Sequence, residues 1–542
     1  MADLNPSSFL DTSGETTPVW VHTDPYSNRP EFPKLTADVS DDVCVIGSGI
    51  SGVSTAYHLV KQGKSVTMIE ARNFLSGESG RTSGHLASNL DDGYTAIASK
   101  FGKDGAKVAA ESHQWALQHV GDVARELNID CEYRILKGYT VSQYPVGTED
   151  HKKDIKMLQD EVNKSRELGL DASFQEGLKI QGWDGGVDQR ATAVFGHQAT
   201  FHPTKYLNGL LKWLKNQPNF TGYSQRRATN VSESGVTVPV VHTHLGPTGV
   251  TIETANGHTI TCTDSVEATC VPLQKLSVIA EMVYLRTYCI AIRVPKGSVE
   301  DCLIYDTAEV YKYIRLTSCD AEWDYLVVGG CDHKVGQENE QDARYAELET
   351  WTRERFTRAG PVDYRWSGQI FEPVDYMAFI GKNSGADHRY IITGDSGNGL
   401  THGVLAGKLI SDLILGKENS WADVYDPKRK ATLAKSVPSM LKHDVQINAQ
   451  YKRFLQTDIA DIEDLARGKG GVLNATGKKP IAVYKDENGN VSKRSALCPH
   501  LGGVVCWNDS EKSWDCPIHG SRFAKDGTQL IGPAAAGLRE EE

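Results

Sequence analysis

The chain has 542 residues, which suggests roughly three domains, and a formal net charge of −12, which argues against nucleic acid and anionic membranes as partners. No apolar run approaches the roughly 18 residues of a membrane-spanning helix, and residues 1–18 are polar and acidic rather than signal-like. We therefore expect a cytoplasmic protein with no integral membrane segment, whose eleven cysteines are mainly reduced thiols because they lack a disulfide spacing.

The first predicted domain follows an N-terminal arm, residues 1–40, that is rich in Pro, Ser and Thr. Residues 42–46 read as a buried strand that runs into a glycine turn, an apolar helix and a second strand. In this setting the glycines allow close backbone approach, the helix N-terminus binds pyrophosphate, and a carboxylate binds a ribose hydroxyl. The pattern predicts a dinucleotide site formed by Gly47, Gly49, Ile50, Ser51, Gly52, Glu70, Ala71 and Arg72.

Two later segments indicate which dinucleotide is bound. The small-residue loop 76–85 resembles the flavin-contacting segment of the D-amino-acid-oxidase and glycine-oxidase superfamily. Residues 390–403 read as a strand, a glycine turn and a helix start, and they resemble the turn that closes the FAD site in that superfamily. A helix N-terminus there would stabilise the negative charge of a reduced flavin. Related amine dehydrogenases carry a covalently attached histidine in the first loop; Arg81 stands at that position here and His85 slightly beyond it, so we expect noncovalent FAD. The resemblance implies further FAD contacts from Ser79, Gly80, Arg81, Thr82, Val231, Gly394, Asp395, Gly397, Asn398, Gly399, Leu400 and Thr401.

The same resemblance implies a fold class. The FAD-binding domain is expected to be a Rossmann-like α/β domain of the glutathione-reductase type, built from residues 41–89, 201–272 and 367–416. An α+β substrate domain is expected to be inserted in it, built from residues 90–200 and 273–366.

Candidate catalytic residues lie in both expected domains. Tyr311, Tyr313 and Arg315 alternate along a predicted strand, so that their side chains share one face. This face is either a polar wall that binds a carboxylate through Arg315 or a plain exposed strand surface. His202 begins a predicted helix and His402 lies at the flavin-side helix start; each is a candidate for contact with flavin or substrate, with a structural histidine as the alternative.

The end of the chain changes in character. Residues 417–456 are predicted to form a linker helix, because 426–429 looks like a helix start. Residues 457–542 show short strands and turns, with a hairpin signal at 486–490, and predict an all-β domain.

Two Cys-plus-His pairs lie in this last domain: Cys498 with His500, and Cys516 with His519. Two thiolates and two imidazoles suit a Rieske [2Fe–2S] cluster, in which each pair of like ligands binds one iron. A structural zinc site is the alternative, because zinc takes the same ligand types. The surrounding Cys-Pro-His and Cys-Pro-Ile-His-Gly-Ser patterns resemble the Rieske family, with these four residues at its metal-ligand positions.

Departures from the respiratory members of that family imply a lower potential. Gly503 and Ile518 stand where those members carry a disulfide, and Phe523 stands where they carry a tyrosine that bonds a ligand sulfur. Ser521 remains as a hydroxyl donor. Fewer hydrogen bonds to sulfur stabilise the reduced cluster less, so we expect a ferredoxin-like Rieske centre.

These features together favour an FAD- and [2Fe–2S]-dependent oxidoreductase. The leading hypothesis is hydride transfer to flavin from a carbon next to an amine nitrogen, with single electrons leaving through the cluster to an external acceptor. The acceptor or donor is a ferredoxin-like carrier, a quinone, a reductase or O2. The alternatives are a reductase-fed oxygenase or reductase acting on a small molecule, and a non-catalytic electron carrier.

Overall fold

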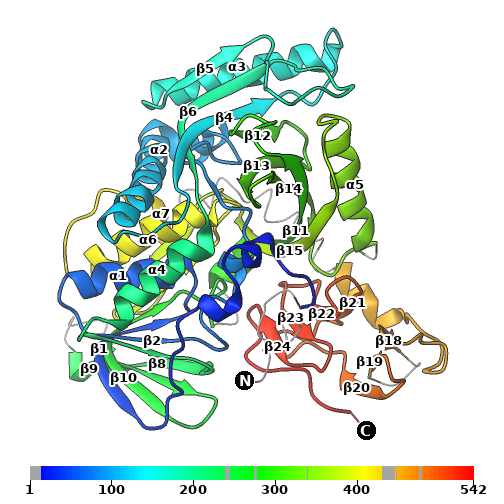
Figure 1. Cartoon of the computed structure of the whole chain (residues 1–542). Helices are drawn as coiled ribbons and strands as arrows, with labels where there is room; N and C mark the ends of the chain where they lie inside the picture. The colour runs from blue at the N-terminus through cyan, green and yellow to red at the C-terminus, as the bar shows by residue number, and fades with distance from the viewer. Residues whose placement is uncertain are drawn as a thin grey trace.

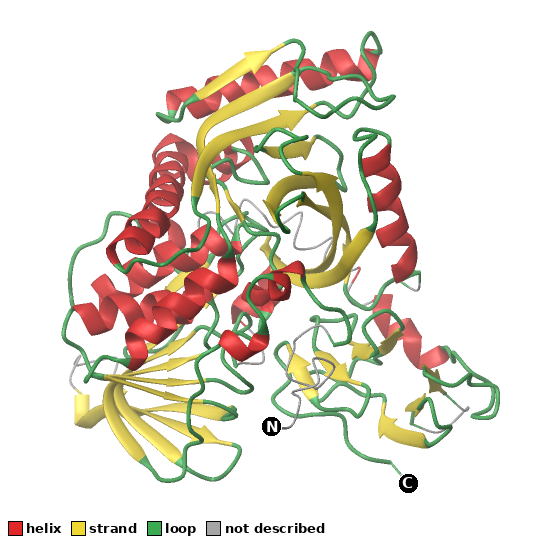
Figure 2. Ribbon diagram, viewed as in Figure 1, coloured by secondary structure: helices red, strands yellow, loops and turns green. Residues whose placement is uncertain are grey.

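The computed structural model describes residues 14–237, 244–273, 277–338, 340–429, 446, 449–474 and 479–541. Over these residues the chain forms two large sheets and two small ones (Figure 1). Helices lie against both large sheets, whereas the small sheets form a C-terminal unit made mostly of strands and loops (Figure 2). None of the helices in the described part of the chain is both long and apolar enough to cross a membrane.

The first large sheet has the strand order β16-β17-β10-β1-β2-β7, and the hairpin β8–β9 continues beside β10. Its centre is parallel: β1 (Val39–Ile46) lies between β2 (Val66–Ile69) and β10 (Thr259–Glu267). The last four residues of β1 are buried, as a parallel strand covered on both faces requires. The other strands are β7 (Phe220–Tyr223), β8 (Ala228–Thr237), β9 (His244–Thr254), β16 (Phe379–Lys382) and β17 (Arg389–Thr393).

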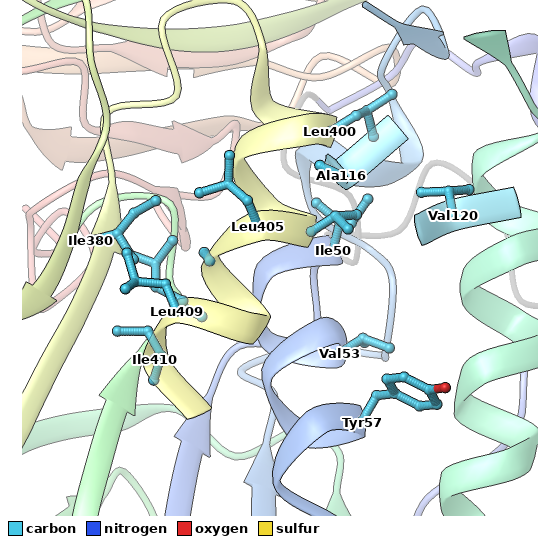
Figure 3. Close-up of a cluster of buried hydrophobic side chains, with 14 of the residues drawn as sticks. Ile50, Val53, Tyr57, Ala116, Val120, Ile380, Leu400, Leu405, Leu409 and Ile410 are labelled. Atoms are coloured by element: carbon cyan, nitrogen blue, oxygen red, sulfur yellow. The ribbon is translucent and has the colours of Figure 1, made fainter. Parts of the chain in front are cut away.

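Four helices pack over this sheet: α1 (Ile50–Lys61), α2 (Tyr94–Glu126), α4 (Pro203–Lys215) and α6 (Gly399–Ile414). α1 and α6 approach closely, because a Cβ placed on Gly407 would lie 2.6 Å from the backbone of α1. Figure 3 shows apolar side chains of α1, α2, α6 and β16 in one buried cluster. The largest apolar core therefore lies between this sheet and its helices.

α2 belongs to this layer, although the sequence led us to place residues 90–200 in the substrate domain. Its buried face, which includes Ala106, Ala116 and Val120, joins the same core as α1. Gly102, with φ of 73°, interrupts the helix near its start. Apolar residues spaced three and four apart form the buried face of α2, but such spacing does not indicate which sheet a helix covers.

The second large sheet has the order β15-β11-β14-β13-β12-β4-β6-β3, with β5 paired to β6. Next to its edge strand lies β11 (Met282–Pro295), which is antiparallel to β14 (Trp323–Lys334) and to the edge strand β15 (Val362–Pro373). Residues 367–373 therefore lie in this sheet and not in the first one, where they were expected. The remaining elements are β3 (His85–Leu86), β4 (Arg134–Val141), β5 (Ala172–Gln175), β6 (Thr192–Thr200), β12 (Leu303–Asp306), β13 (Lys312–Ser318), α3 (Glu149–Glu167) and α5 (Gln341–Arg353).

The C-terminal unit contains two small antiparallel sheets around a shared apolar core. The hairpin expected at 486–490 is present: the Asp486 N–H donates to the Asn490 carbonyl at 2.9 Å. The first sheet comprises β18 (Lys469–Leu473), β19 (Ile481–Lys485) and β20 (Val491–Ser495). The second comprises β21 (Cys506–Asn508), β22 (Ser513–Asp515), β23 (Arg522–Ala524) and β24 (Gln529–Ile531).

The segment that connects α6 to the C-terminal unit is described mainly at its two ends. α7 (Ala422–Tyr425) precedes a turn at 426–429, where a helix start was predicted, and the 3-10 helix η5 (Gln450–Leu455) follows later. Residues 430–445, 447 and 448 of the predicted linker helix lie outside the described residues. Other 3-10 helices are η1 (Val19–His22), η2 (Tyr26–Asn28), η3 (Glu78–Gly80) and η4 (Ser277–Glu281).

The junction of the C-terminal unit with the rest of the chain is a buried charge network around Glu511. Its fully buried carboxylate lies 3.7 Å from Arg81 and 3.4 Å from Arg286, accepts a hydrogen bond from the Ser367 hydroxyl, and accepts the Thr16 N–H at 3.1 Å. Burial raises the pKa of Glu511, but the nearby arginine charges outweigh it, so the pKa lies below its ordinary value. The N-terminal arm, the loop that follows β2, the second large sheet and the C-terminal unit therefore meet at one ionised carboxylate.

We predict that Glu511→Ala destabilises this junction, because the substitution leaves two buried arginines without their carboxylate. The expected loss is about 3–5 kcal/mol in the free energy of unfolding, measured in urea by far-ultraviolet circular dichroism. The lowered pKa also predicts that the native junction is stable above pH 4.5 and weakens as the pH falls below it.

Asp509→Ala is the matched control, since Asp509 lies in the same loop but forms partly exposed ion pairs with Lys469 and Lys512. It should change the unfolding free energy by about 1 kcal/mol or less. Equal losses in the two variants would contradict the role assigned to Glu511.

Candidate functional site

One long cavity lies between the two large sheets and is bordered by the C-terminal unit. At one end the glycine turn after β1 and the residues after β2 line it. At the other end, residues of β11 and β13 line it, together with Tyr305 and Asp91. The N-terminus of α6 also borders the cavity.

The glycine-turn end is built to receive a phosphate-linked ligand. Gly47 has φ of +105°, and a Cβ on Gly49 would lie 3.0 Å from the Ser79 hydroxyl, so the turn leaves room only for backbone. The Ile50 N–H, at the start of α1, donates to the same hydroxyl at 2.9 Å. Glu70 accepts the Ser48 N–H at 3.1 Å and is thereby fixed beside the turn. This arrangement suits pyrophosphate at the helix N-terminus and ribose beside the carboxylate.

The start of α6 offers a second polar contact. The Asp395 Oδ1 atom is buried and has no hydrogen-bond partner within the described residues, and burial raises the pKa of this carboxyl to about 7. A buried polar atom of this kind needs a partner, which the hydroxyls of a bound dinucleotide would supply. Gly397, with φ of +72°, lets the turn pass close to Asp91. The residues of the cavity therefore fit FAD.

Most of the predicted FAD contacts line this cavity. They are Gly47, Gly49, Ile50, Ser51, Glu70, Ala71, Arg72, Ser79, Arg81, Thr82, Asp395, Gly397, Asn398, Gly399 and Leu400. The remaining five, Gly52, Gly80, Val231, Gly394 and Thr401, are not among the lining residues.

Two of these five differences have clear packing reasons. A Cβ on Gly52 would lie 1.9 Å from the Gly47 carbonyl, so this glycine allows the turn to close rather than touching a ligand. Val231 lies within an apolar cluster, and Ala228, three residues earlier on β8, lines the cavity instead.

The end of the cavity away from the glycine turn has a wall of tyrosines. Tyr305, Tyr311 and Tyr313 line it, and the Tyr311 hydroxyl donates to the Asp91 carboxylate at 2.7 Å. The Asp91 side chain is exposed to the open space of the cavity. The cavity itself is enclosed by protein, and this burial raises the pKa of the Asp91 carboxyl to about 6. Asp91 was missed from the sequence because it follows no strand pattern or motif.

Arg315 does not line the cavity, although it shares a strand with Tyr313. Its buried guanidinium donates to the carbonyls of Gly84 and Phe201, both at 2.7 Å, and to that of Leu316 at 2.9 Å. Through these bonds Arg315 holds the backbone of the flavin loop (residues 76–85) in place, and its donors are not available to a substrate carboxylate.

The two candidate histidines are also held by protein groups. His202 caps α4, accepting the Lys205 N–H at 3.3 Å, and its other ring nitrogen lies 2.9 Å from the Thr23 hydroxyl. His402 lies 2.8 Å from the Asp395 carbonyl and 3.2 Å from a ring nitrogen of His113, and burial lowers its pKa to about 4. Neither histidine lines the cavity.

The predicted metal ligands lie on two loops that are closed in the same way. The Cys498 N–H donates to the Gly503 carbonyl at 2.9 Å, and the Cys516 N–H donates to the Ser521 carbonyl at 2.8 Å. In each loop the fifth residue is a glycine with positive φ, 73° at Gly502 and 65° at Gly520, whose N–H donates back to the cysteine carbonyl. The local sequence therefore fixes both loops.

The loops bring like ligands together. The Cys498 and Cys516 thiols are hydrogen bonded to one another, and the rings of His500 and His519 lie 5.0 Å apart. In the described part of the chain, no three His, Cys, Asp or Glu side chains converge on a single ion site. Paired cysteines and paired histidines fit a two-iron cluster better than a zinc ion with four ligands.

The residues in and around the cluster loops include the positions at which the sequence departs from the respiratory Rieske proteins. The Ser521 hydroxyl hydrogen bonds the Cys498 sulfur, and Phe523 is fully buried. Gly503 and Ile518, at the positions of the family disulfide, pack directly together, because a Cβ on Gly503 would lie 2.4 Å from Ile518 Cγ1. Contact between these residues replaces the covalent link.

The second cluster loop touches the wall of the cavity. The Gln369 side-chain amide donates to the Gly520 carbonyl at 2.8 Å, and Gln369 itself lines the cavity. The ring of His519 lies against Tyr284, with centroids 5.9 Å apart. A Cβ on Gly520 would lie 2.6 Å from the Gln369 amide nitrogen, so only glycine permits this approach. The Gln369 side chain therefore lies between the flavin cavity and Gly520, the residue next to the predicted cluster ligand His519.

Comparisons with known proteins agree with this architecture. Residues 42–413 match the FAD dependent oxidoreductase family (DAO), and residues 456–540 match the Rieske [2Fe-2S] domain. The chain is 28% identical over 518 residues to a putative Rieske 2Fe-2S iron-sulfur protein, YhfW, of Bacillus subtilis, covering 95% of this chain and 96% of that protein. It is 24% identical to the Escherichia coli gamma-glutamylputrescine oxidoreductase, covering 71% of this chain and 86% of that one.

Two solved structures share the fold of the first part. Glycine oxidase from Geobacillus kaustophilus has a TM-score of 0.57 at 15% identity, covering 72% of this chain and 99% of its own. The L-amino acid deaminase from Proteus vulgaris has a TM-score of 0.57 at 17% identity, covering 74% of this chain and 100% of its own. The chain therefore belongs to the DAO family of FAD-dependent oxidoreductases, with FAD as the cofactor of its cavity and a C-terminal Rieske domain for a [2Fe–2S] cluster.

Proposed function

We propose that this protein oxidises the carbon–nitrogen bond of a cationic amine and passes the electrons singly through the Rieske cluster to an external acceptor. The observation that carries this proposal is the contact between the cluster loop and the cavity wall at Gln369 and Gly520. FAD supplies a hydride acceptor, and a [2Fe–2S] cluster carries one electron at a time. A contact between the two sites is what the transfer of single electrons from flavin to cluster requires.

The charge of the cavity supports an amine as the substrate. Asp91 is the carboxylate beside the tyrosine wall, and burial lowers the pKa of nearby His85 to about 3, so that this imidazole is neutral. The four arginines that line the cavity donate to protein carbonyls: Arg72 to Leu530, Arg81 to Ser367, Arg226 to Leu35, and Arg227 to Gln529. Within the described residues, the tyrosine end thus offers an anion for an ammonium group, whereas each lining arginine already donates to a protein carbonyl.

Each of these residues has a role in the proposed reaction. The Asp91 carboxylate would hold the ammonium group of the substrate, and the Tyr311 hydroxyl, which donates to it, would fix its position. Tyr305 and Tyr313 would enclose the carbon chain and exclude water. The amine that loses hydride must be neutral, so the ionised Asp91 is also a suitable acceptor for its proton.

We predict that Asp91→Asn weakens the binding of butane-1,4-diamine about tenfold or more, because a hydrogen bond to a charged group contributes about 1.5–3 kcal/mol. Binding is measured anaerobically from the perturbation of the flavin spectrum. In the native protein, affinity should rise as the pH passes upward through about 6, where Asp91 ionises.

Two comparisons sharpen this experiment. Asp92→Asn removes the same charge one residue away, where the carboxylate accepts from the Ser396 hydroxyl at 2.9 Å and does not line the cavity, so its effect should be small. The second comparison is 4-aminobutanoate, which carries a carboxylate in place of one ammonium group. Equal binding of the two ligands by the native protein would contradict a cavity selective for cations.

The relay is tested with His519→Ala, which removes a cluster ligand. Flavin reduction by an amine, measured anaerobically per bound FAD, should stay near the native rate, since hydride transfer needs only the flavin and the cavity. Turnover with a one-electron acceptor that does not oxidise flavin directly should fall at least tenfold. Undiminished turnover would show that the cluster is not on the path, and loss of the flavin half-reaction would favour electron flow from the cluster to the flavin.

A further inference from the structure

The FAD cavity has a wall that comes from the Rieske domain. Four consecutive residues, 529–532, which include all of β24, line the cavity together with Glu70 and Arg72 at its glycine-turn end. Figure 1 shows β24 on the side of the Rieske domain that faces the first sheet. The part of the cavity suited to the adenosine half of FAD is therefore completed by the second domain.

This wall is tied to the FAD-binding domain by hydrogen bonds and by packing. Arg227 donates to the Gln529 carbonyl at 3.1 Å, and Arg72 donates to the Leu530 carbonyl. Ile531 is 6% exposed and joins an apolar cluster with Val271 and Phe371, both of which also line the cavity. A displacement of β24 would open the cavity and expose these apolar side chains.

The same segment rests on a cluster loop. A Cβ on Gly532 would lie 2.5 Å from the Ser521 Cα, so the two backbones are in direct contact. The Ala534 N–H donates to the Ser521 hydroxyl at 3.2 Å, and that hydroxyl also bonds the Cys498 sulfur. Ser521 thus contacts both a cluster ligand and the chain that leads to the FAD wall.

From these contacts we infer that the Rieske domain is a structural part of the FAD site, and that cluster and FAD stabilise each other's binding. A cluster that orders the loop at 516–521 holds Gly532 and β24 against the cavity. FAD beneath β24 in turn holds the hairpin that supports the loop. Coupling between two binding sites is reciprocal, and coupling factors of about 5–150 are typical. This role is separate from electron transfer and does not depend on the identity of the substrate.

The experiment measures the dissociation constant of FAD for the full chain by the quenching of flavin fluorescence. Ile531→Ala leaves all four cluster ligands in place, and its Rieske EPR signal reports that the cluster is intact. We expect its FAD dissociation constant to rise about tenfold, within the typical coupling range. Cys516→Ser, which cannot assemble the cluster, should show a rise of similar size. In the native protein, removal of FAD should speed the loss of iron to a chelator.

Thr528→Ala is the matched control, because Thr528 is an exposed residue at the turn of the same hairpin. It should leave the FAD dissociation constant unchanged. Native FAD affinity in an Ile531→Ala protein with an intact EPR signal would overturn the inference. Weak FAD binding by Cys516→Ser would not rescue it, because that loss would then reflect misfolding alone. Iron loss at the same rate with and without FAD would contradict the claim that bound FAD stabilises the cluster.

Discussion

The arrangement of the whole molecule depends on one buried carboxylate. Glu511, from the Rieske domain, lies between Arg81 of the flavin loop and Arg286 of the second sheet, and also binds Thr16 of the N-terminal arm. A buried charge is tolerated only where opposite charges and hydrogen bonds surround it, so each of these segments must be in place for the network to form. The network therefore fixes how the two domains meet and, with them, the positions of their cofactor sites.

A fixed junction matters because the two cofactor sites do different chemistry. Hydride transfer delivers two electrons at once, whereas the cluster accepts them singly, so the proposed relay needs a short and constant separation. The bond from Gln369 to Gly520 provides a contact of this kind beside His519. The position accepts only glycine, since any Cβ there would collide with Gln369 and Tyr284.

The sequence predicted those parts of the site in which short spacing determines geometry. The loops at Cys498 and Cys516 are closed by hydrogen bonds within a few residues, and the glycine turn at Gly47 leads directly into α1, so these motifs carry the structure. Long-range partners could not be predicted. Strand alternation placed Arg315 on the same face as Tyr313, yet carbonyls from distant segments take up its donors.

The Rieske contribution to the cavity could not be read from the sequence either, because the bond from Arg72 to Leu530 spans 458 residues. No spacing rule connects two such positions, and each domain has a complete motif of its own. The two motifs indicate a modular protein, in which an FAD enzyme is joined to an electron carrier. The contacts at β24 show instead that the FAD cavity is shared between the domains.

Hydrogen bonding around the cluster sets the direction in which its potential should differ from that of respiratory Rieske centres. The Cys498 sulfur accepts from the Ser521 hydroxyl and from the backbone of its own loop, whereas Phe523 is buried and brings no hydroxyl. Each donor to sulfur stabilises the more negative, reduced cluster, and the loss of one lowers the potential. Because the same Ser521 hydroxyl accepts the Ala534 N–H, the group that tunes the cluster also supports the wall of the FAD site. Under the coupling inferred above, the electron affinity of the cluster and the closure of the flavin cavity share the Ser521 side chain.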